Sequence, residues 1–103
     1  MKLALKTLAH HLAEVEDTEP VVIGFDGKVL LFRISGNLVV LAAEGSSWMS
    51  YFSLPAGKLR SLPKRLNSVN VEVSVWRSRL NIDRFRYDGI VETAWNSKQG
   101  KNS

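Results

Sequence analysis

The stretch VVIGFDGKVLLFRISGNLVVLAA, residues 21–43, decides the fold expected for this chain. Asp26-Gly27 separates two apolar runs, as in a two-residue turn between hairpin strands. Ser35-Gly36-Asn37 marks a second turn before a third apolar run. Because consecutive strands joined by short turns usually pair with each other, the stretch predicts the start of an antiparallel meander.

A fourth strand and a short helix are expected directly downstream. Trp48–Leu54 continues the meander after a polar turn. Pro55 suits the first turn of a helix, and leucines follow it at helical spacing, so a helix is expected over residues 55–62. Pro63 would break a helix interior, so a separate turn is expected there.

The remaining sequence predicts about three more strands. Residues 69–75 alternate valine with polar residues, the period of a strand with one buried face. Arg77-Ser78 is expected to turn the chain into a strand over Arg79–Tyr87. Asp88-Gly89 then leads to a last strand over Ile90–Trp95. The polar tail, residues 96–103, is expected to be disordered.

Upstream of the meander, residues 2–16 predict an amphipathic helix. Its apolar positions recur at intervals of three and four residues, and Pro20 closes the segment. These positions are Leu5, Leu8, Leu12 and Val15. The chain is therefore expected to form one α+β domain over residues 1–95. In this domain two short helices are expected to pack on one or more antiparallel sheets. The expected order of elements along the chain is α-β-β-β-β-α-β-β-β.

Composition narrows the class of protein. The chain has 103 residues, of which 45% are hydrophobic and 23% charged, as in an ordinary globular domain. It has no cysteine, which removes disulfides and thiolate chemistry and suits a reducing cytoplasm. No apolar run approaches the roughly 18–20 residues that span a bilayer. A cytoplasmic protein with no membrane partner is expected.

Charge is distributed unevenly along the chain. Residues 1–54 hold four basic and six acidic side chains, whereas residues 55–103 hold ten basic and four acidic ones. A basic half can attract phosphate, acidic protein or anionic membrane. A solvated surface that keeps the protein soluble explains the same charge equally well.

One part of the sequence resembles a domain of the DNA polymerase processivity clamp, the sliding clamp family. It consists of residues 52–59, Leu62-Pro63, residues 69–75 and Arg79-Leu80-Asn81-Ile82. The hairpin over residues 26–31 is similar to one in the same domains. The resemblance covers roughly residues 2–90 and implies a DNA-clamp-like arrangement of the helices and sheets. Clamps close a ring from six such domains, carried two or three per chain, so a single clamp-like domain implies a homo-oligomer.

The resemblance also implies where DNA would bind. In the family, the two helices of each domain face the central hole and carry basic side chains near the phosphates. By position, the corresponding residues are Lys2, Lys6, Lys58, Arg60, Lys64 and Arg65. Basic side chains on a helix neutralise phosphate without reading sequence, although ordinary solvent-facing positions are the alternative. The hypothesis is a non-enzymatic, self-associating module that binds duplex DNA without a cofactor.

Two other binding functions remain open. Cations and aromatic rings interleave at Arg77, Arg79 and residues 84–87, with Trp76 nearby. This pattern can hold single-stranded nucleic acid, with Arg84, Arg86 and Tyr87 as possible contacts. However, Phe85 and Tyr87 share one face of their strand, which favours partial burial in the core. The second alternative is a protein-interaction domain with no nucleic-acid role, which uses sheet edges or exposed aromatic rings.

The sequence gives little support for metal binding or catalysis. His10 and His11 are adjacent on the first helix, with Glu14 within reach, but two ligands are too few for a metal site. Surface histidines and no metal are therefore expected. Neither histidine lies beside a nucleophile or a carboxylate pair, and no glycine-rich phosphate loop is present. No catalytic residue is expected.

Overall fold

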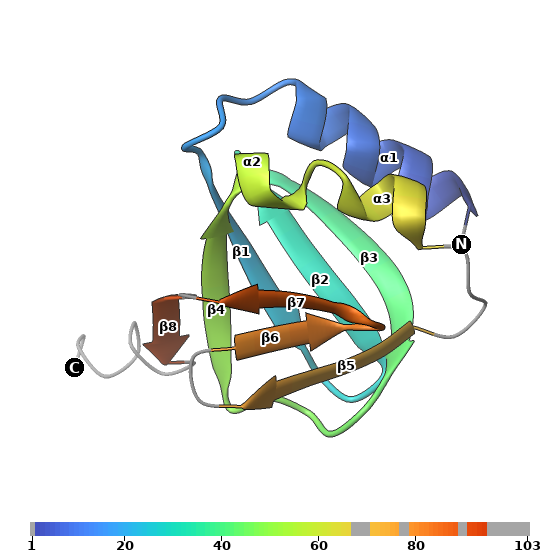
Figure 1. Cartoon of the computed structure of the whole chain (residues 1–103), viewed down its shortest axis with the longest axis vertical. Helices are drawn as coiled ribbons and strands as arrows, with labels where there is room; N and C mark the ends of the chain where they lie inside the picture. The colour runs from blue at the N-terminus through green and yellow to red at the C-terminus, as the bar shows by residue number, and fades with distance from the viewer. Residues whose placement is uncertain (1, 67–70, 77–78, 89–90, 95–103) are drawn as a thin grey trace.

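The computed structural model describes residues 2–66, 71–76, 79–88 and 91–94, and it confirms the α+β class (Figure 1). The expected tail over residues 96–103 lies outside this part of the chain. Three helices and eight strands are described. They are α1 (Lys2–Ala13), β1 (Pro20–Phe25), β2 (Val29–Ile34), β3 (Asn37–Glu44), β4 (Ser50–Pro55), α2 (Ala56–Leu59), α3 (Leu62–Arg65), β5 (Val71–Trp76), β6 (Arg79–Ile82), β7 (Phe85–Asp88) and β8 (Val91–Ala94).

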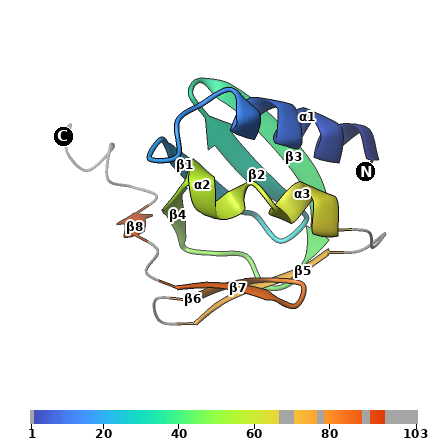
Figure 2. The ribbon, with the colours of Figure 1, turned by 45° about the horizontal axis from the view of Figure 1, so that its top comes forward.

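The strands follow the order β7-β6-β5-β3-β2-β1-β4-β8, in which all neighbours are antiparallel except β3 and β5. That parallel contact involves only the pairs Ala43↔Val71 and Glu44↔Glu72. The molecule therefore consists of a first sheet, β3-β2-β1-β4-β8, and a second sheet, β5-β6-β7. Figures 1 and 2 show the helices lying together across one side of the two sheets.

The predicted meander is confirmed, with a change at its first turn. Phe25 and Leu30 form the last pair between β1 and β2, so the connection is longer than the expected two-residue turn. The Asp26 carboxylate accepts the backbone N–H groups of Lys28 at 2.8 Å and Val29 at 2.9 Å. These hydrogen bonds stabilise the longer turn and lower the pKa of Asp26.

The single strand expected over Arg79–Tyr87 is wrong, because the chain turns at Asp83 and Arg84. The φ of Asp83 is 55°, in the left-handed region that aspartate tolerates better than most residues. Its backbone N–H donates to the Glu72 carbonyl at 2.7 Å, and its carboxylate accepts the Glu72 N–H at 3.0 Å. In the part of the chain that the structure describes, four strands therefore follow the helices, where about three were expected.

The region after Pro55 forms two short helices where one helix and a turn were expected. Pro63 lies in the first turn of α3, where a missing N–H removes no bond within the helix. The expectation of a non-helical turn at Pro63 is therefore wrong. Leu59 and Leu62, one from each helix, are fully buried.

One hydrophobic core lies between the two sheets and the helices. Its largest fully buried side chains come from α1, from both sheets and from α2 and α3. They include Leu8, Leu12, Phe25, Phe32, Leu59, Leu62 and Leu80. This shared core joins the two sheets more extensively than their short parallel contact does. None of the described helices has the length and apolar character needed to cross a bilayer.

Candidate nucleic-acid interface

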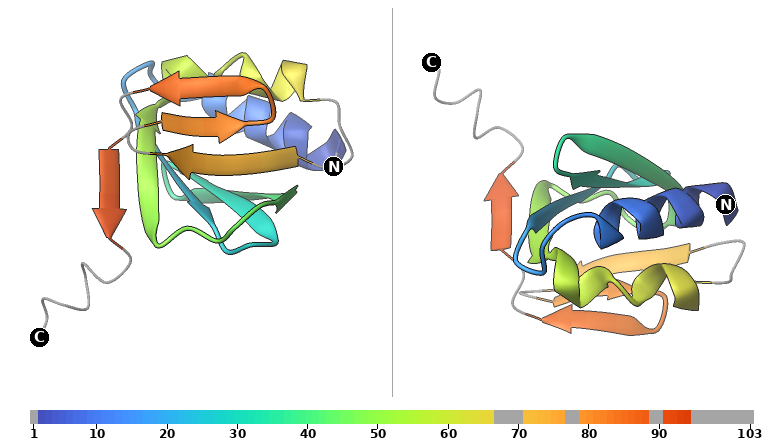
Figure 3. Two further views of the ribbon diagram at one scale, coloured as in Figure 1. Left: turned by 60° about the horizontal axis from the view of Figure 1, so that its bottom comes forward. Right: turned by 90° about the horizontal axis from the view of Figure 1, so that it is seen from above.

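The helices form a layer in which α1 runs antiparallel to α2 and α3. The right-hand view of Figure 3 shows α1 beside the two shorter helices, with its N-terminus near α3. The other end is fixed by backbone hydrogen bonds from Ala56 to Glu19 at 2.8 Å and from Gly57 to Asp17 at 3.0 Å. The two helical segments that carry the predicted phosphate-binding residues therefore lie on one side of the molecule.

Four exposed cations lie on segments that Figures 1 and 3 place at the end of the molecule where α1 begins, and we call this set the basic end. Lys6 comes from α1, and Lys64 and Arg65 come from the last turn of α3. Arg84 comes from the β6–β7 turn, which Figures 1 and 3 place at the same end of the molecule. Lys2 is the first residue of α1. The basic end thus combines residues from both nucleic-acid hypotheses, although Asp83 lies in the same turn as Arg84.

Arg65 is held in place by an aromatic ring of β7. Its guanidinium carbon lies 5.5 Å from the centroid of the Phe85 ring, within cation–π range. Phe85 and Tyr87 are half-buried against the core, and this burial raises the pKa of Tyr87. Because the guanidinium is already restrained, it would lose less conformational freedom on binding an anion than a free side chain would.

Arg60 serves the fold and is not part of the basic end. Its Nε donates to the Leu12 carbonyl at 3.1 Å, and its terminal nitrogens donate to the Val15 carbonyl and the Asp17 carboxylate. The last carbonyls of a helix lack partners within the helix, and Arg60 satisfies one of them at the end of α1. Arg60 is therefore removed from the predicted set of phosphate contacts.

Lys58 lies at the opposite end of the helix layer, beside a cluster of carboxylates. It is exposed on α2, whose first residues hydrogen-bond to the loop that follows α1. We call the carboxylates there the acidic end: Glu14, Glu16, Asp17 and Glu19. Their charges offset that of Lys58, so the helix layer is polarised from the acidic end to the basic end.

The alternation predicted for residues 84–87 is confirmed, and it separates the rings from the cations. Phe85 and Tyr87 face the core, whereas Arg84 and Arg86 are exposed. An exposed ring on the outer face of the second sheet is instead provided by Trp76, which is 65% exposed and paired with Arg79. The sequence places Trp76 near the Arg and aromatic residues, but Trp76 is not among the predicted contact residues Arg84, Arg86 and Tyr87.

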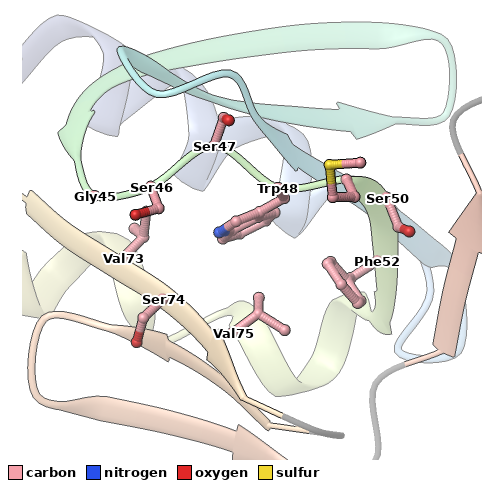
Figure 4. Close-up of a pocket in the computed structure, with 10 residues that line it drawn as sticks. Gly45, Ser46, Ser47, Trp48, Ser50, Phe52, Val73, Ser74 and Val75 are labelled. Atoms are coloured by element: carbon pink, nitrogen blue, oxygen red, sulfur yellow. The ribbon is translucent and has the colours of Figure 1, made fainter.

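A cavity of about 520 Å³ opens between the two sheets, on the β3–β4 connection and β5 (Figure 4). The Trp48 ring lies in it, with ring centroids 5.4 Å from Phe52 and 5.7 Å from Phe25. Apolar side chains and serine hydroxyls line the cavity, and none of the lining residues is ionisable. They are Gly45, Ser46, Ser47, Trp48, Met49, Ser50, Phe52, Val73, Ser74 and Val75. This lining offers contact surface but no acid, base or charged anchor.

Comparison of the chain with protein-family models, curated proteins and solved structures finds no match. The function is therefore proposed from the residues, their geometry and the sequence resemblance described above.

Proposed function

We propose that the chain is a non-enzymatic, clamp-like module that self-associates and binds duplex DNA without sequence preference. The observation that carries this proposal is that Lys6, Lys64, Arg65 and Arg84 are exposed on segments that meet at one end of the molecule. These cations come from three separate segments and lie at one end of the helix layer. Such a group can neutralise several neighbouring phosphates without reading base edges.

Polarisation of the helix layer gives the duplex a preferred position. The carboxylates of the acidic end repel phosphate, so the duplex lies nearer the basic end. If all four cations contact phosphates, the logarithm of the affinity falls with the logarithm of salt with a slope of about −3.6. Affinity then falls by roughly 10² between 50 and 200 mM salt.

The sheet supports self-association. Among the described strands, β7 and β8 stand at opposite ends of the strand order. The outer edge of such a strand presents backbone groups that can pair with another chain. Pairing of β7 in one copy with β8 in the next joins different surfaces, which produces a closed ring or an open filament. The resemblance to clamp domains favours the ring.

Duplex binding is tested by the double variant Lys64→Glu plus Arg65→Glu. The matched control is Lys28→Glu plus Arg33→Glu, which makes the same change in net charge at two exposed residues outside the helix layer. Fluorescence anisotropy with a labelled duplex is measured over a range of salt. The first variant should bind at least about tenfold more weakly, with a salt slope reduced by about 1.8. The control should stay close to wild type.

Two results would reject the proposal. Equal weakening in both variants would show that net charge acts without a defined interface. No duplex binding by the wild-type chain at about 50 mM salt would remove DNA as the partner. Circular dichroism of each variant checks that the loss of the Arg65–Phe85 contact does not unfold the protein. Lys6→Glu changes the cation that α1 contributes to the basic end, and it should also weaken duplex binding.

Exposed apolar side chains on the outer face of the first sheet support a second candidate function, binding to another protein. Leu38 is 62% exposed and Val40 is 42% exposed, and both lie on β3. Val40 pairs with Leu31 on β2, which extends the apolar surface to a second strand. Apolar side chains gathered in this way are typical of protein contact sites. If this candidate holds, Leu38→Asp weakens partner binding and Lys64→Glu does not.

A further inference from the structure

Three metal-ligating side chains converge at the C-terminal end of α1, where Glu14 follows the last helical residue. His10 Nε2 lies 3.1 Å from one carboxylate oxygen of Glu14, and His11 Nδ1 lies 4.0 Å from the other. One ligand atom from each residue lies within 4.8 Å of the other two. Glu14 follows the histidines by four and three residues, so its carboxylate lies one helical turn beyond both. The sequence suggested two ligands, whereas the structure brings three together.

The environment of His11 is a second, independent indication that this cluster binds a ligand. Its side chain is only 20% exposed, and its Nδ1 atom is buried with no hydrogen-bond partner among the described residues. The 4.0 Å separation from Glu14 is too long for a hydrogen bond. Because a buried polar atom without a partner costs free energy, a ligand bound between His11 and Glu14 would recover that cost.

The electrostatic surroundings favour a cation at this position. The remaining carboxylates of the acidic end, Glu16, Asp17 and Glu19, follow directly in the chain. The C-terminal end of α1 also carries the negative end of the helix dipole. Arg60 reaches this region, but its charge is paired with Asp17.

We propose that His10, His11 and Glu14 bind one Zn²⁺ ion. Two imidazole nitrogens and one carboxylate oxygen are a known set of zinc ligands, and a water molecule completes the tetrahedron. Bonds of about 2.0–2.1 Å require ligand atoms about 3.3 Å apart. The 3.1 Å between His10 and Glu14 is close to this value, whereas the 4.0 Å between His11 and Glu14 must shorten by side-chain rotation when the ion binds. The site adds a cation to the acidic end and does not depend on DNA binding.

Calorimetric titration with Zn²⁺ tests the site, with Glu14→Gln as the variant and Glu16→Gln as the matched control. Both changes remove one exposed carboxylate charge from the same segment. The wild-type chain and the control should each bind one ion. Glu14→Gln should bind at least about tenfold more weakly, since even changes to residues behind the ligands cost 10–100-fold. His10→Ala, at a largely exposed position, should weaken binding as well.

Absorption with Co²⁺ in place of Zn²⁺ reports the coordination directly. Intense visible bands that are lost in Glu14→Gln would support a tetrahedral site made by these residues. Equal zinc affinity in Glu14→Gln and Glu16→Gln would overturn the proposal, as would failure of the wild-type chain to bind one ion. Neither outcome bears on the basic end, because no DNA is present in the measurement.

Discussion

At the scale of single residues, Gly45 controls how closely the two sheets approach. It has a φ of 146°, and a Cβ atom there would lie 2.4 Å from the carbonyl oxygen of Val73 on β5. Gly45→Ala must therefore push β5 away from the β3–β4 connection, in addition to straining the backbone. We expect the free energy of unfolding to fall by more than the roughly 1–3 kcal/mol typical of backbone strain alone. Urea denaturation measures this loss.

Gly36→Ala is the matched control for that substitution. Gly36 also has a positive φ, 88°, but no heavy atom would lie within 4 Å of its added Cβ. This variant should lose only the strain component, about 1–3 kcal/mol. The difference between the two alanine variants isolates the contact with Val73. Equal losses would contradict the inferred close approach of the sheets at Gly45.

At the scale of secondary-structure elements, Arg60 joins α1 to α2 and α3. Arg60→Met keeps most of the apolar stem but removes the hydrogen bonds to Leu12, Val15 and Asp17. We expect the free energy of unfolding to fall by at least about 1.5–3 kcal/mol, the range for a single hydrogen bond that involves a charged group, because three such bonds are lost. Thermal and urea denaturation provide the measurement. Lys58→Met is the control, because it removes a nearby cation that is exposed on α2.

The geometry of the guanidinium gives this prediction a second check. Arg60→Lys should restore little stability, because one ammonium group cannot reach three acceptors arranged around a planar fork. If Arg60→Met is as stable as Lys58→Met, the hydrogen bonds at the end of α1 contribute nothing measurable. Arg60 would then return to the set of available cations.

The elements that periodicity could predict are those stabilised by local contacts. The first helix and the meander follow from apolar spacing and from turns such as Ser35-Gly36, where both φ angles are positive. The Asp83 turn depends on hydrogen bonds to Glu72, eleven residues earlier. The role of Arg60 depends on Leu12, 48 residues away. Contacts between such distant residues leave no period in the sequence.

The candidate site could be predicted only in part, because local spacing gives the exposed side of a helix but not which elements lie beside it. Amphipathic spacing is enough to place Lys6 and Lys64 on the outer sides of helices. It cannot give the antiparallel arrangement of α1 and α3, which separates the basic end from the acidic end. Nor can it bring Arg84 to the basic end, because the β6–β7 turn was itself missed. The metal cluster required side-chain positions as well as spacing.

At the scale of the whole molecule, the open edge of β7 determines whether copies can join through the sheet. Ile82 and Phe85 close the two-residue β6–β7 turn, so they form a hydrogen-bonded pair. The next pair, Asn81 and Arg86, is then of the non-hydrogen-bonded type. The backbone N–H of Arg86 therefore points away from β6 and toward a neighbouring copy.

Arg86→Pro removes that N–H while keeping the hydrogen bonds between β6 and β7, since proline is tolerated where the donor faces outward from an edge strand. If β7 of one copy pairs with β8 of the next, this variant should be monomeric by light scattering, whereas the wild-type chain forms oligomers. Arg86→Ala loses the charge but keeps the N–H, so it should remain oligomeric. A monomeric wild-type chain at every concentration would exclude self-association, and dissociation of both variants would assign the contact to the guanidinium.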